Sequence, residues 1–330
     1  MADTDSHSTL PRFPLGTWPT PLEPAPRLAV AIGLGPDDLW IKRDDLTGLG
    51  GGGNKIRKLE WTVAAAMAAG ADTLVTTGAP QSNHARLTAA AAARAGMAAV
   101  LVFPGDGADS HSGNIALDGL FGARIAWAGD VDHDALSHTA ETVVAELRAQ
   151  GARPALIPFG GSSALGARGY LEAGRELLGQ APDLHTVVVA LGSGGTMAGL
   201  VAALGSDAVL GVHTGALEDP GPVVAEFAGQ ISDIEVATEQ LRVRLDQVGA
   251  GYGQLTAPTA EAILLAARTE GIVLDPVYTG RAMAGLVAAV ADGTVERGRK
   301  IVFLHTGGLP GLFGHPSAIA FAESSLTTYP

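Results

Sequence analysis

The sequence predicts an α/β protein built on parallel sheets. Short apolar runs alternate with alanine-rich helical stretches along most of its 330 residues. Hydrophobic residues make up 47% of the chain but aromatic residues only 5%, as is typical of α/β proteins with many small-residue helices. Repeated strand–helix alternation favours parallel strands with helices on both faces. A chain of this length can also bury a sizeable core.

The predicted elements follow in order along the chain. The strands are Leu39–Arg43, Thr73–Thr76, Ala98–Phe103, Arg124–Ala128, Ala155–Pro158, Val187–Leu191, Val209–His213, Gly271–Leu274 and Lys300–Leu304. The helices are Ile56–Met67, Ala85–Ala95, Ala140–Ala149, Gly169–Leu178, Ala198–Ala203, Thr259–Glu270 and Gly280–Ala291. The proline-rich residues 9–28 are predicted to form an extended arm, and residues 104–114 an exposed loop. Because such sheets bind ligands beyond the carboxyl ends of their strands, we expect functional motifs just after strands.

Composition excludes several classes of function. The net charge of −13, without a basic stretch, argues against nucleic acid or an anionic membrane as a partner. The chain has no cysteine, so disulfides, thiolate metal sites and a cysteine nucleophile are excluded. Nine scattered histidines form no pattern that predicts a metal site. The polar N-terminus and the lack of a long apolar run predict a soluble, cytoplasmic protein.

A run of four glycines, Gly50–Gly53, precedes Asn54 and Lys55. Glycines allow a positive φ and leave room for a flat ligand. The helical spacing of Ile56–Met67 places Lys55 at a helix N-terminus, where the macrodipole disfavours a cation. A lysine there is well placed to lose its proton and attack a carbonyl. The alternative is a solvated lysine after a flexible turn.

A second glycine cluster follows a predicted strand and precedes a helix. It consists of Gly192, Ser193, Gly194, Gly195 and Thr196. Its N–H groups and hydroxyls would form a phosphate cradle at the helix N-terminus. The dinucleotide fingerprint is absent, because Met197 stands where its third glycine belongs. A phosphate site for another ligand is therefore favoured over a nicotinamide site, and a structural turn is the alternative.

Polar residues also follow other strands. Gln81, Ser82, Asn83 and His84 open a helix, where they would suit a carboxylate and a phenolate-like oxygen, although simple helix capping is the alternative. The segments Asp275–Arg281 and His305–Gly308 lie at similar junctions. Two of the four tyrosines, Tyr252 and Tyr278, occupy turn-like positions, where a core-edge role is the alternative.

One ligand would account for all of these motifs. Pyridoxal phosphate has an aldehyde for a lysine, a phosphate, a phenolic oxygen and a ring nitrogen. A non-catalytic binding module is the alternative from another class, although the combination of lysine, phosphate loop and two tyrosines argues against it. We therefore predict a pyridoxal 5'-phosphate enzyme.

Several segments resemble the D-cysteine desulfhydrase and 1-aminocyclopropane-1-carboxylate (ACC) deaminase family. They are Ile41–Asp45, Gly52–Glu60, Gln81–His84, Gly160–Gly166 and Leu274–Gly285. The resemblance extends from about Pro14 to Phe313. It implies a fold-type II enzyme like the tryptophan synthase β-subunit, with two open twisted parallel-sheet domains, the cofactor between them, and usually a homodimer. Residues 1–52 and 165–330 would form the large domain, and residues 53–164 the smaller one.

The resemblance also implies roles for individual residues around the cofactor. Lys55 corresponds to the Schiff-base lysine, Asn83 to the ligand of the ring oxygen, and Gly192–Thr196 to the phosphate loop. Thr306 corresponds to the partner of the ring nitrogen. Its neutral hydroxyl would leave the pyridine unprotonated, which favours β-elimination over transamination. Ser82 resembles the residue near the substrate carboxylate and α-proton.

The remaining assignments concern the substrate. Tyr278 resembles the tyrosine packed near the cofactor and Tyr252 a second active-site tyrosine. The residues expected around the substrate are Gln81, Ser82, His84 and Thr279. Ring-opening deaminases typically carry glutamate where this chain has Thr279, which favours the desulfhydrase form. The expected reaction is α,β-elimination on a small amino acid such as D-cysteine. Elimination of sulfite from L-cysteate and opening of the cyclopropane ring are the alternatives.

Overall fold

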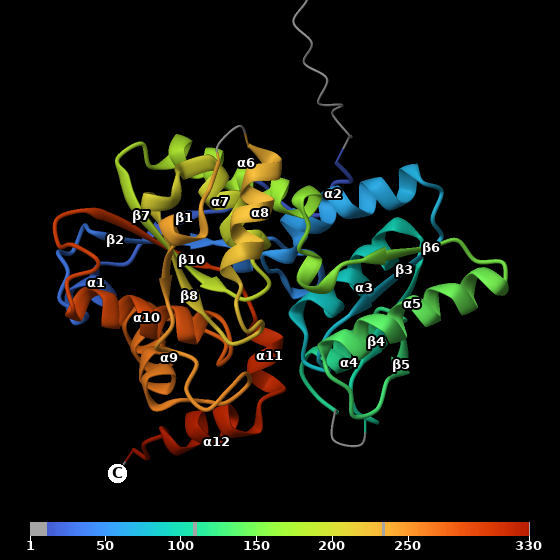
Figure 1. Ribbon diagram of the computed structural model, residues 1–330. Helices are drawn as coiled ribbons and strands as arrows, with labels where there is room; N and C mark the ends of the chain where they lie inside the picture. Colours follow the sequence, from blue (N-terminus) through green and yellow to red (C-terminus); the bar gives the residue numbers. More distant parts are fainter. Residues whose placement is uncertain (1–11, 108–110, 233–234, 330) are drawn as a thin grey trace, which may run out of the picture.

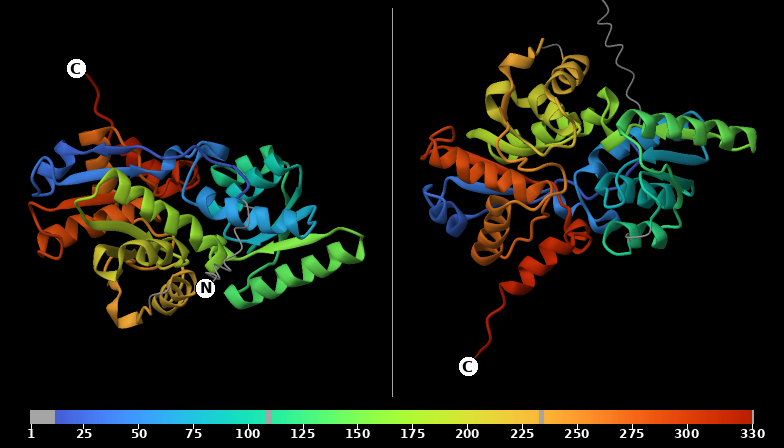
Figure 2. Two further views of the ribbon diagram at one scale, coloured as in Figure 1. Left: turned by 90° about the horizontal axis from the view of Figure 1, so that it is seen from above. Right: turned by 60° about the horizontal axis from the view of Figure 1, so that its bottom comes forward.

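The structure, a computed structural model, describes residues 12–107, 111–232 and 235–329. Its elements form two sheets that lie side by side, each covered by helices (Figures 1 and 2). Neighbouring strands are parallel in every pair except β1–β2 at one edge of the larger sheet. The predicted α/β class with parallel sheets is therefore confirmed.

The larger sheet has six strands. In spatial order they are β1 (Leu22–Pro24), β2 (Leu39–Arg43), β10 (Lys300–His305), β7 (Leu184–Leu191), β8 (Val209–His213) and β9 (Arg242–Arg244). Successive residues of β7 enter different cores, because side chains of a strand alternate between its faces. Val188 packs with α1, α9 and α10, and its neighbours Val187 and Val189 pack with α6, α7 and α8. Both faces of the sheet are thus buried, as expected of parallel strands.

The helices on the two faces of this sheet have the following bounds. They are α1 (Pro26–Ala31), α9 (Ala257–Glu270) and α10 (Thr279–Ala291) on one face, and α6 (Ala164–Gln180), α7 (Gly195–Leu204) and α8 (Gly221–Ile231) on the other. The short helices α11 (Leu309–Phe313) and α12 (Pro316–Ser324) follow β10.

The smaller sheet has four parallel strands. Their order is β5 (Arg124–Trp127), β4 (Ala98–Phe103), β3 (Thr73–Thr77) and β6 (Pro154–Ile157). Its helices are α2 (Lys55–Ala68), α3 (Asn83–Ala95), α4 (Asn114–Leu120) and α5 (His133–Ala149). One core joins the sheet to α2 and α3, and a separate core joins it to α5. All four strands come from within the predicted smaller domain, residues 53–164, whose exact ends stay a prediction.

Two local predictions are wrong. Gly271–Leu274 forms no strand, although Ile272 and Leu274 are buried and Val273 between them is exposed. This alternation reflects an extended segment that packs on the core without joining a ladder; the Val273 carbonyl instead accepts a hydrogen bond from the His305 ring at 3.1 Å. The arm predicted at residues 9–28 contains β1 and the start of α1, where Pro26 stands at a position that suits proline. Residues 9–11 lie outside the described part of the chain.

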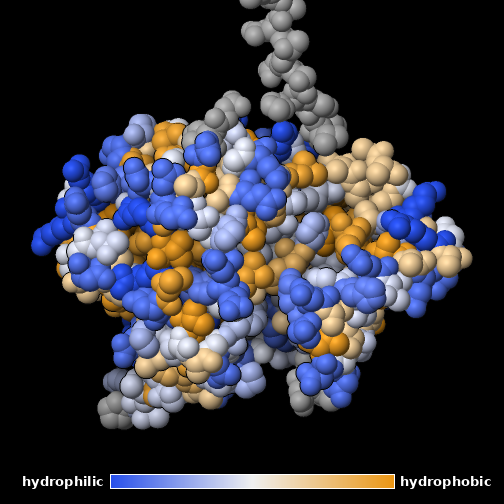
Figure 3. All heavy atoms as spheres, in the orientation of Figure 1, coloured by the Kyte–Doolittle hydropathy of each residue, from blue (hydrophilic) through white to orange (hydrophobic). Residues whose placement is uncertain are grey.

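The outer surface is mixed. Apolar side chains form patches separated by hydrophilic ones, and a hollow lies between the lower ends of the two halves (Figure 3). None of the helices in the described segments combines the length and apolar character needed to cross a bilayer.

Candidate active site

A pocket lies between the two sheets, mainly where strands end. It is lined by Asn54, Lys55, Lys58, Ala79, Ser82, Asn83, His84, Phe159, Gly160, Ala190, Leu191, Gly192, Ser193, Gly194, Thr196, Met197, Ala216, Tyr252, Tyr278 and Thr306. The wall therefore takes residues from after β3, β6, β7 and β10 and from the start of α2. This is the edge at which parallel α/β sheets bind ligands.

Lys55 is the first residue of α2. The glycine run before it needs its glycines, since a Cβ on Gly52, at φ +74°, would lie 1.9 Å from the Asp45 carbonyl oxygen. The Asn54 N–H donates to the Thr306 carbonyl at 3.0 Å, which joins the start of α2 to the end of β10. Burial lowers the pKa of Lys55 to about 8, although a hydrogen bond with Lys58 opposes this shift. Near physiological pH Lys55 is therefore mostly protonated, but its neutral fraction is much larger than that of an ordinary lysine.

Lys58 lies one helical turn further along the same face. Its Nζ donates to the Gly160 carbonyl at 3.2 Å and to Ser162 Oγ at 3.0 Å. The side chain is buried, and burial together with the charge of Lys55 holds its pKa well below the usual range. None of the described residues that line the pocket is an aspartate or a glutamate. An anion bound in the pocket would therefore stabilise the protonated form of both amines.

The predicted phosphate loop lies beside these lysines, at the N-terminus of α7. The N–H of Gly195 donates to Ser162 Oγ at 3.2 Å, and Ser162 Oγ lies 2.7 Å from Ser193 Oγ. A Cβ on Gly195 would come within 3.0 Å of Lys58 Nζ. The N–H of Gly195, two serine hydroxyls, a helix N-terminus and a lysine thus converge, which suits a phosphate. The side chain of Gly195's neighbour Thr196 accepts from Asn54 Nδ2 at 3.1 Å.

Of the predicted motif at the start of α3, Ser82, Asn83 and His84 line the pocket and Gln81 does not. Ser82 caps the helix, since its Oγ accepts from the Ala85 N–H at 3.1 Å, and it also lines the pocket with Asn83. Gln81 lies outside the pocket wall: its amide donates to the Ser112 carbonyl at 2.7 Å and accepts from the Asn114 N–H at 2.9 Å. Capping and a place at the pocket are therefore compatible for Ser82.

His84 is buried in the pocket wall and neutral. The hydroxyl of Thr76 donates to the Ile157 carbonyl at 2.9 Å, so it must accept the proton of His84 Nε2, also at 2.9 Å. Nδ1 is left as an acceptor without a partner among the described residues. Burial and the two lysines hold the pKa of His84 well below its usual range.

The two tyrosines of the pocket wall contact each other, with their rings edge to face and the ring centroids 6.2 Å apart. Their hydroxyl oxygens, in Tyr252 and Tyr278, are 2.6 Å apart, and burial raises the pKa of both. Arg281 donates to the carbonyls of Gly251 and Gln254, at 2.7 and 2.8 Å, and so fixes the backbone on both sides of Tyr252. Thr279 does not line the pocket, because its buried hydroxyl donates to Asp275 Oδ1 at 2.7 Å.

Lys58, Ser162 and Asn54 are site residues that the sequence-based prediction missed. The spacing of Lys58 could have indicated its place, because it lies three residues after Lys55 and therefore on the same face of the helix. Ser162 follows a glycine pair and carries no such signal. Among the described residues, His, Asp and Glu form no group that could hold a metal ion.

The site defines a class of protein. It combines a partly buried lysine of lowered pKa, a phosphate cradle and polar groups for a ring oxygen, at the strand ends of an α/β fold. These are the groups that pyridoxal phosphate requires, so the residues present fit this cofactor.

Comparison with known proteins agrees with this class. The sequence matches the family "pyridoxal-phosphate dependent enzyme" over residues 14–307. The chain belongs to this family. It is 42% identical over 325 residues to the D-cysteine desulfhydrase of Salmonella typhi, a match that covers 93% of this chain and 97% of the relative. The D-cysteine desulfhydrase of Salmonella newport (strain SL254) matches equally.

Solved structures support the same fold. A crystal structure of an ACC deaminase homologue superimposes with a TM-score of 0.85 and 38% identity, covering 94% of this chain and 96% of the other. The processed form of tomato (Solanum lycopersicum) threonine deaminase isoform 2 has a TM-score of 0.64 at 18% identity, with 92% and 88% of the chains covered. The second likeness concerns the fold alone. The predicted fold-type II class, the family and the pyridoxal phosphate cofactor are confirmed.

Proposed function

We propose that this protein is a carbon–sulfur lyase that converts D-cysteine and water into pyruvate, ammonia and hydrogen sulfide. The observation that carries the proposal is Lys55, which is partly buried beside the phosphate cradle and has a pKa of about 8. The sequence identity of 42% to D-cysteine desulfhydrases, over nearly the whole of both chains, supports this choice of substrate.

The cofactor would be held by residues from both halves of the molecule. When bound, pyridoxal phosphate supplies an electron sink that stabilises negative charge at the substrate α-carbon. Lys58 and the loop from Gly192 to Thr196 would bind its phosphate, and Asn83 and Thr306 would bind its ring oxygen and ring nitrogen. Because Lys55 begins a helix that is tied to the end of β10 through the Asn54 N–H, its backbone is held in a defined position beside the pocket.

The same lysine is suited to move the α-proton. Its pKa of about 8 leaves a substantial neutral fraction at physiological pH, and neutral Nζ accepts a proton. Ser82 and the N-terminus of α3 would bind the substrate carboxylate. The paired hydroxyls of Tyr252 and Tyr278 would donate to the departing sulfur, since a tyrosine with a raised pKa keeps its proton.

The side chain at position 279 supports elimination over ring opening. The Thr279 hydroxyl is buried and bonded to Asp275, so it offers no acid or base to the pocket. Gln81 is likewise engaged away from the pocket. A substrate role for these two residues stays a proposal that would need a rearrangement of their hydrogen bonds.

A substrate panel tests the proposal. Purified protein would be assayed for keto-acid release with D-cysteine, L-cysteine, L-cysteate, D-serine and the cyclopropane acid. We expect the highest kcat/KM with D-cysteine, accompanied by equimolar sulfide. A higher value with L-cysteate and release of sulfite, or turnover of the cyclopropane acid alone, would contradict it.

We also propose that the protein is a cytoplasmic homodimer, which the family resemblance supports. Light scattering coupled to gel filtration would measure the mass in solution, and cell fractionation the location. A monomeric mass at micromolar concentration would contradict the dimer.

A further inference from the structure

The side-chain amide of Asn83 is held from outside the pocket by two buried residues. Asn114, at the start of α4, donates from Nδ2 to Asn83 Oδ1 at 3.0 Å. Arg86, one turn along α3, donates from Nη2 to the same oxygen at 3.4 Å. Both Asn114 and Arg86 are fully buried, whereas Asn83 lines the pocket.

The direction of these hydrogen bonds follows from the chemistry of arginine. A guanidinium has donors only, so the atom of Asn114 that Arg86 Nε contacts at 3.1 Å must be the oxygen. The other end of the Asn114 amide is then its NH2 group, whose two protons go to Asn83 Oδ1 and to the Gln81 carbonyl, at 3.0 and 2.8 Å. The atom of Asn83 that faces Asn114 is therefore its oxygen.

The consequence appears on the pocket side. With Oδ1 occupied by two donors, Asn83 can present only its NH2 group to a ligand, and Nδ2 has no acceptor among the described residues. We propose that Asn114 is a positioning residue that fixes Asn83 as a hydrogen-bond donor to the anionic ring oxygen of the cofactor. This inference rests on the proposed function only in assigning Asn83 to that oxygen.

Arg86 also contacts the loop that precedes Lys55. Its Nη1 donates to the carbonyls of Gly50 and Gly52, at 2.5 and 2.9 Å, in the loop that precedes Lys55. One buried guanidinium thus connects the loop before Lys55 with the amide of Asn83. Of the two residues, Asn114 is the better target, because its replacement need not disturb that loop.

Replacing Asn114 by the isosteric aspartate exchanges the donor that faces Asn83 for an acceptor. In Asn114→Asp the carboxylate still accepts from Arg86, so the buried cation keeps a partner. A carboxylate cannot donate to Asn83 Oδ1, so that oxygen loses its shorter hydrogen bond and keeps only the 3.4 Å contact from Arg86 Nη2. The Asn83 amide is then expected to turn, directing its NH2 group to the new carboxylate and its oxygen to the pocket. The cofactor oxygen would then meet an acceptor instead of a donor.

The experiment measures cofactor binding by apoprotein, and the absorbance of the bound cofactor against pH. For Asn114→Asp we expect a dissociation constant raised about ten- to a hundred-fold, the range for loss of a charged hydrogen bond. The absorbance transition should move to higher pH, because the anionic oxygen loses its donor. The exposed amide-to-acid change Gln150→Glu, at the end of α5, is the matched control and should alter neither quantity.

The double variant with Asn83→Ala separates positioning from other effects. If Asn114 acts through Asn83, Asn114→Asp changes neither quantity further in the Asn83→Ala background. An equal effect in both backgrounds, or none in the wild type, would overturn the inference while leaving the proposed function intact. If Asn83→Ala itself has no effect, the assignment of Asn83 fails and the inference with it. Should the aspartate variant not fold, Asn114→Ala should give a smaller effect in the same direction, again absent without Asn83.

Discussion

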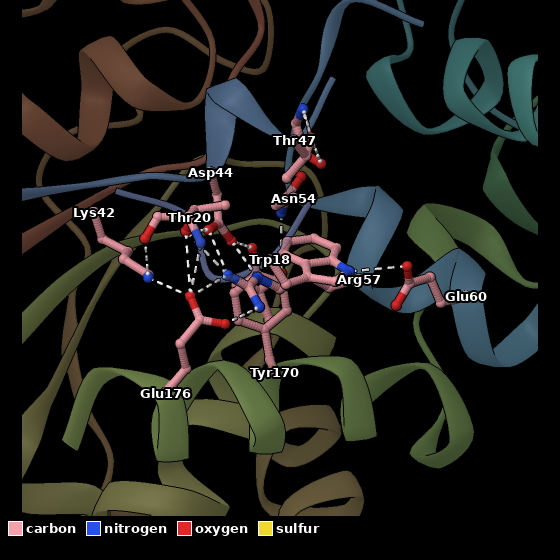
Figure 4. A network of polar contacts seen from close by, with 12 residues as sticks. Trp18, Thr20, Lys42, Asp44, Thr47, Asn54, Arg57, Glu60, Tyr170 and Glu176 are labelled. Carbon is pink, nitrogen blue, oxygen red and sulfur yellow. Dashed lines mark hydrogen bonds and ion pairs between the residues drawn. The ribbon is translucent and has the colours of Figure 1, made fainter. Parts of the chain in front are cut away.

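Helix α2 carries two charged faces that the protein treats in opposite ways. One face presents Lys55 and Lys58 to a pocket without a carboxylate among its described lining residues. The other presents Arg57 to a buried network of acidic groups (Figure 4). A single turn of α2, residues 55–58, therefore contains two lysines without a carboxylate partner and one arginine with two.

The paired face joins distant parts of the chain. Arg57 Nε donates to Asp44 at 2.8 Å and Nη1 to Glu176 at 3.0 Å, and the guanidinium lies 4.1 Å above the Trp18 ring. Lys42 also bonds to Glu176. Although burial opposes it, Asp44 and Glu176 raise the pKa of Arg57, so the cation is stabilised in place.

The contrast separates stability from function. Burial penalises a charge unless a partner offsets it, and the network around Arg57 supplies that partner within the chain. At Lys55 and Lys58 the penalty is not offset, and the pKa of both groups falls. A bound phosphate would supply the negative charge that Lys55 and Lys58 lack, as Asp44 and Glu176 supply it to Arg57.

The largest expected effect concerns Lys55. Lys55→Ala should reduce turnover to background and remove the visible absorbance of covalently bound cofactor, because the reactive amine is lost. Lys300→Ala, which breaks a surface pair with Asp183, is the control and should keep both signals. Retained turnover in the Lys55 variant would contradict the central role of this residue.

The second largest effect is expected at Arg57, on the face of α2 that is paired with Asp44 and Glu176. Arg57→Met should lower the free energy of unfolding by about 3–5 kcal/mol, since Asp44 and Glu176 lose their buried cation. Urea denaturation of the apoprotein measures this, with Lys300→Met as a surface comparison expected to cost ~1 kcal/mol or less. A loss no greater than that of the surface variant would mean that the network contributes little.

In the apoprotein, Lys58→Met should increase stability, whereas Arg57→Met decreases it. Removing a buried amine that has only neutral acceptors and no carboxylate partner is expected to raise the midpoint of thermal unfolding. The same variant should bind pyridoxal phosphate about ten- to a hundred-fold more weakly, yet bind pyridoxal, which has no phosphate, as the wild type does. Equal losses for both ligands would place Lys58 away from the phosphate.

The smallest effect is a pH dependence. Covalent capture of the cofactor aldehyde needs neutral Lys55, and burial lowers the pKa of this group to about 8. The neutral fraction, and hence the capture rate in stopped-flow absorbance, should rise about tenfold between pH 7 and pH 9 and then level off. A rate that still increases above pH 10 would indicate an ordinary lysine.

Much of the fold could be predicted because its strands are short apolar runs with helices between them. The predicted strands at Leu39, Ala98 and Val209 have the observed bounds. Short edge elements such as β1 and β9 were missed, since three residues carry too little periodicity. Gly271–Leu274 shows the converse error, because burial alternates along any extended segment that lies on a core.

The site was partly predictable for a different reason. Glycine runs and polar residues after strands are local signals, so Lys55, Ser82, Asn83 and the loop at Gly192 could be found from sequence. Lys58, Ser162 and Asn114 act through contacts between segments far apart in the chain. The positions of Gln81 and Thr279 likewise depend on hydrogen bonds to such neighbours or to a folded turn.

The most direct test of the account asks which of the two pocket lysines carries the cofactor. Reduction of the cofactor-loaded protein with borohydride, followed by proteolysis and mass spectrometry, locates the modified side chain. We predict a single modification on Lys55, with Lys58 unmodified. Modification of Lys58, or of neither lysine, would contradict the assignment of Lys55 as the residue that binds the cofactor covalently.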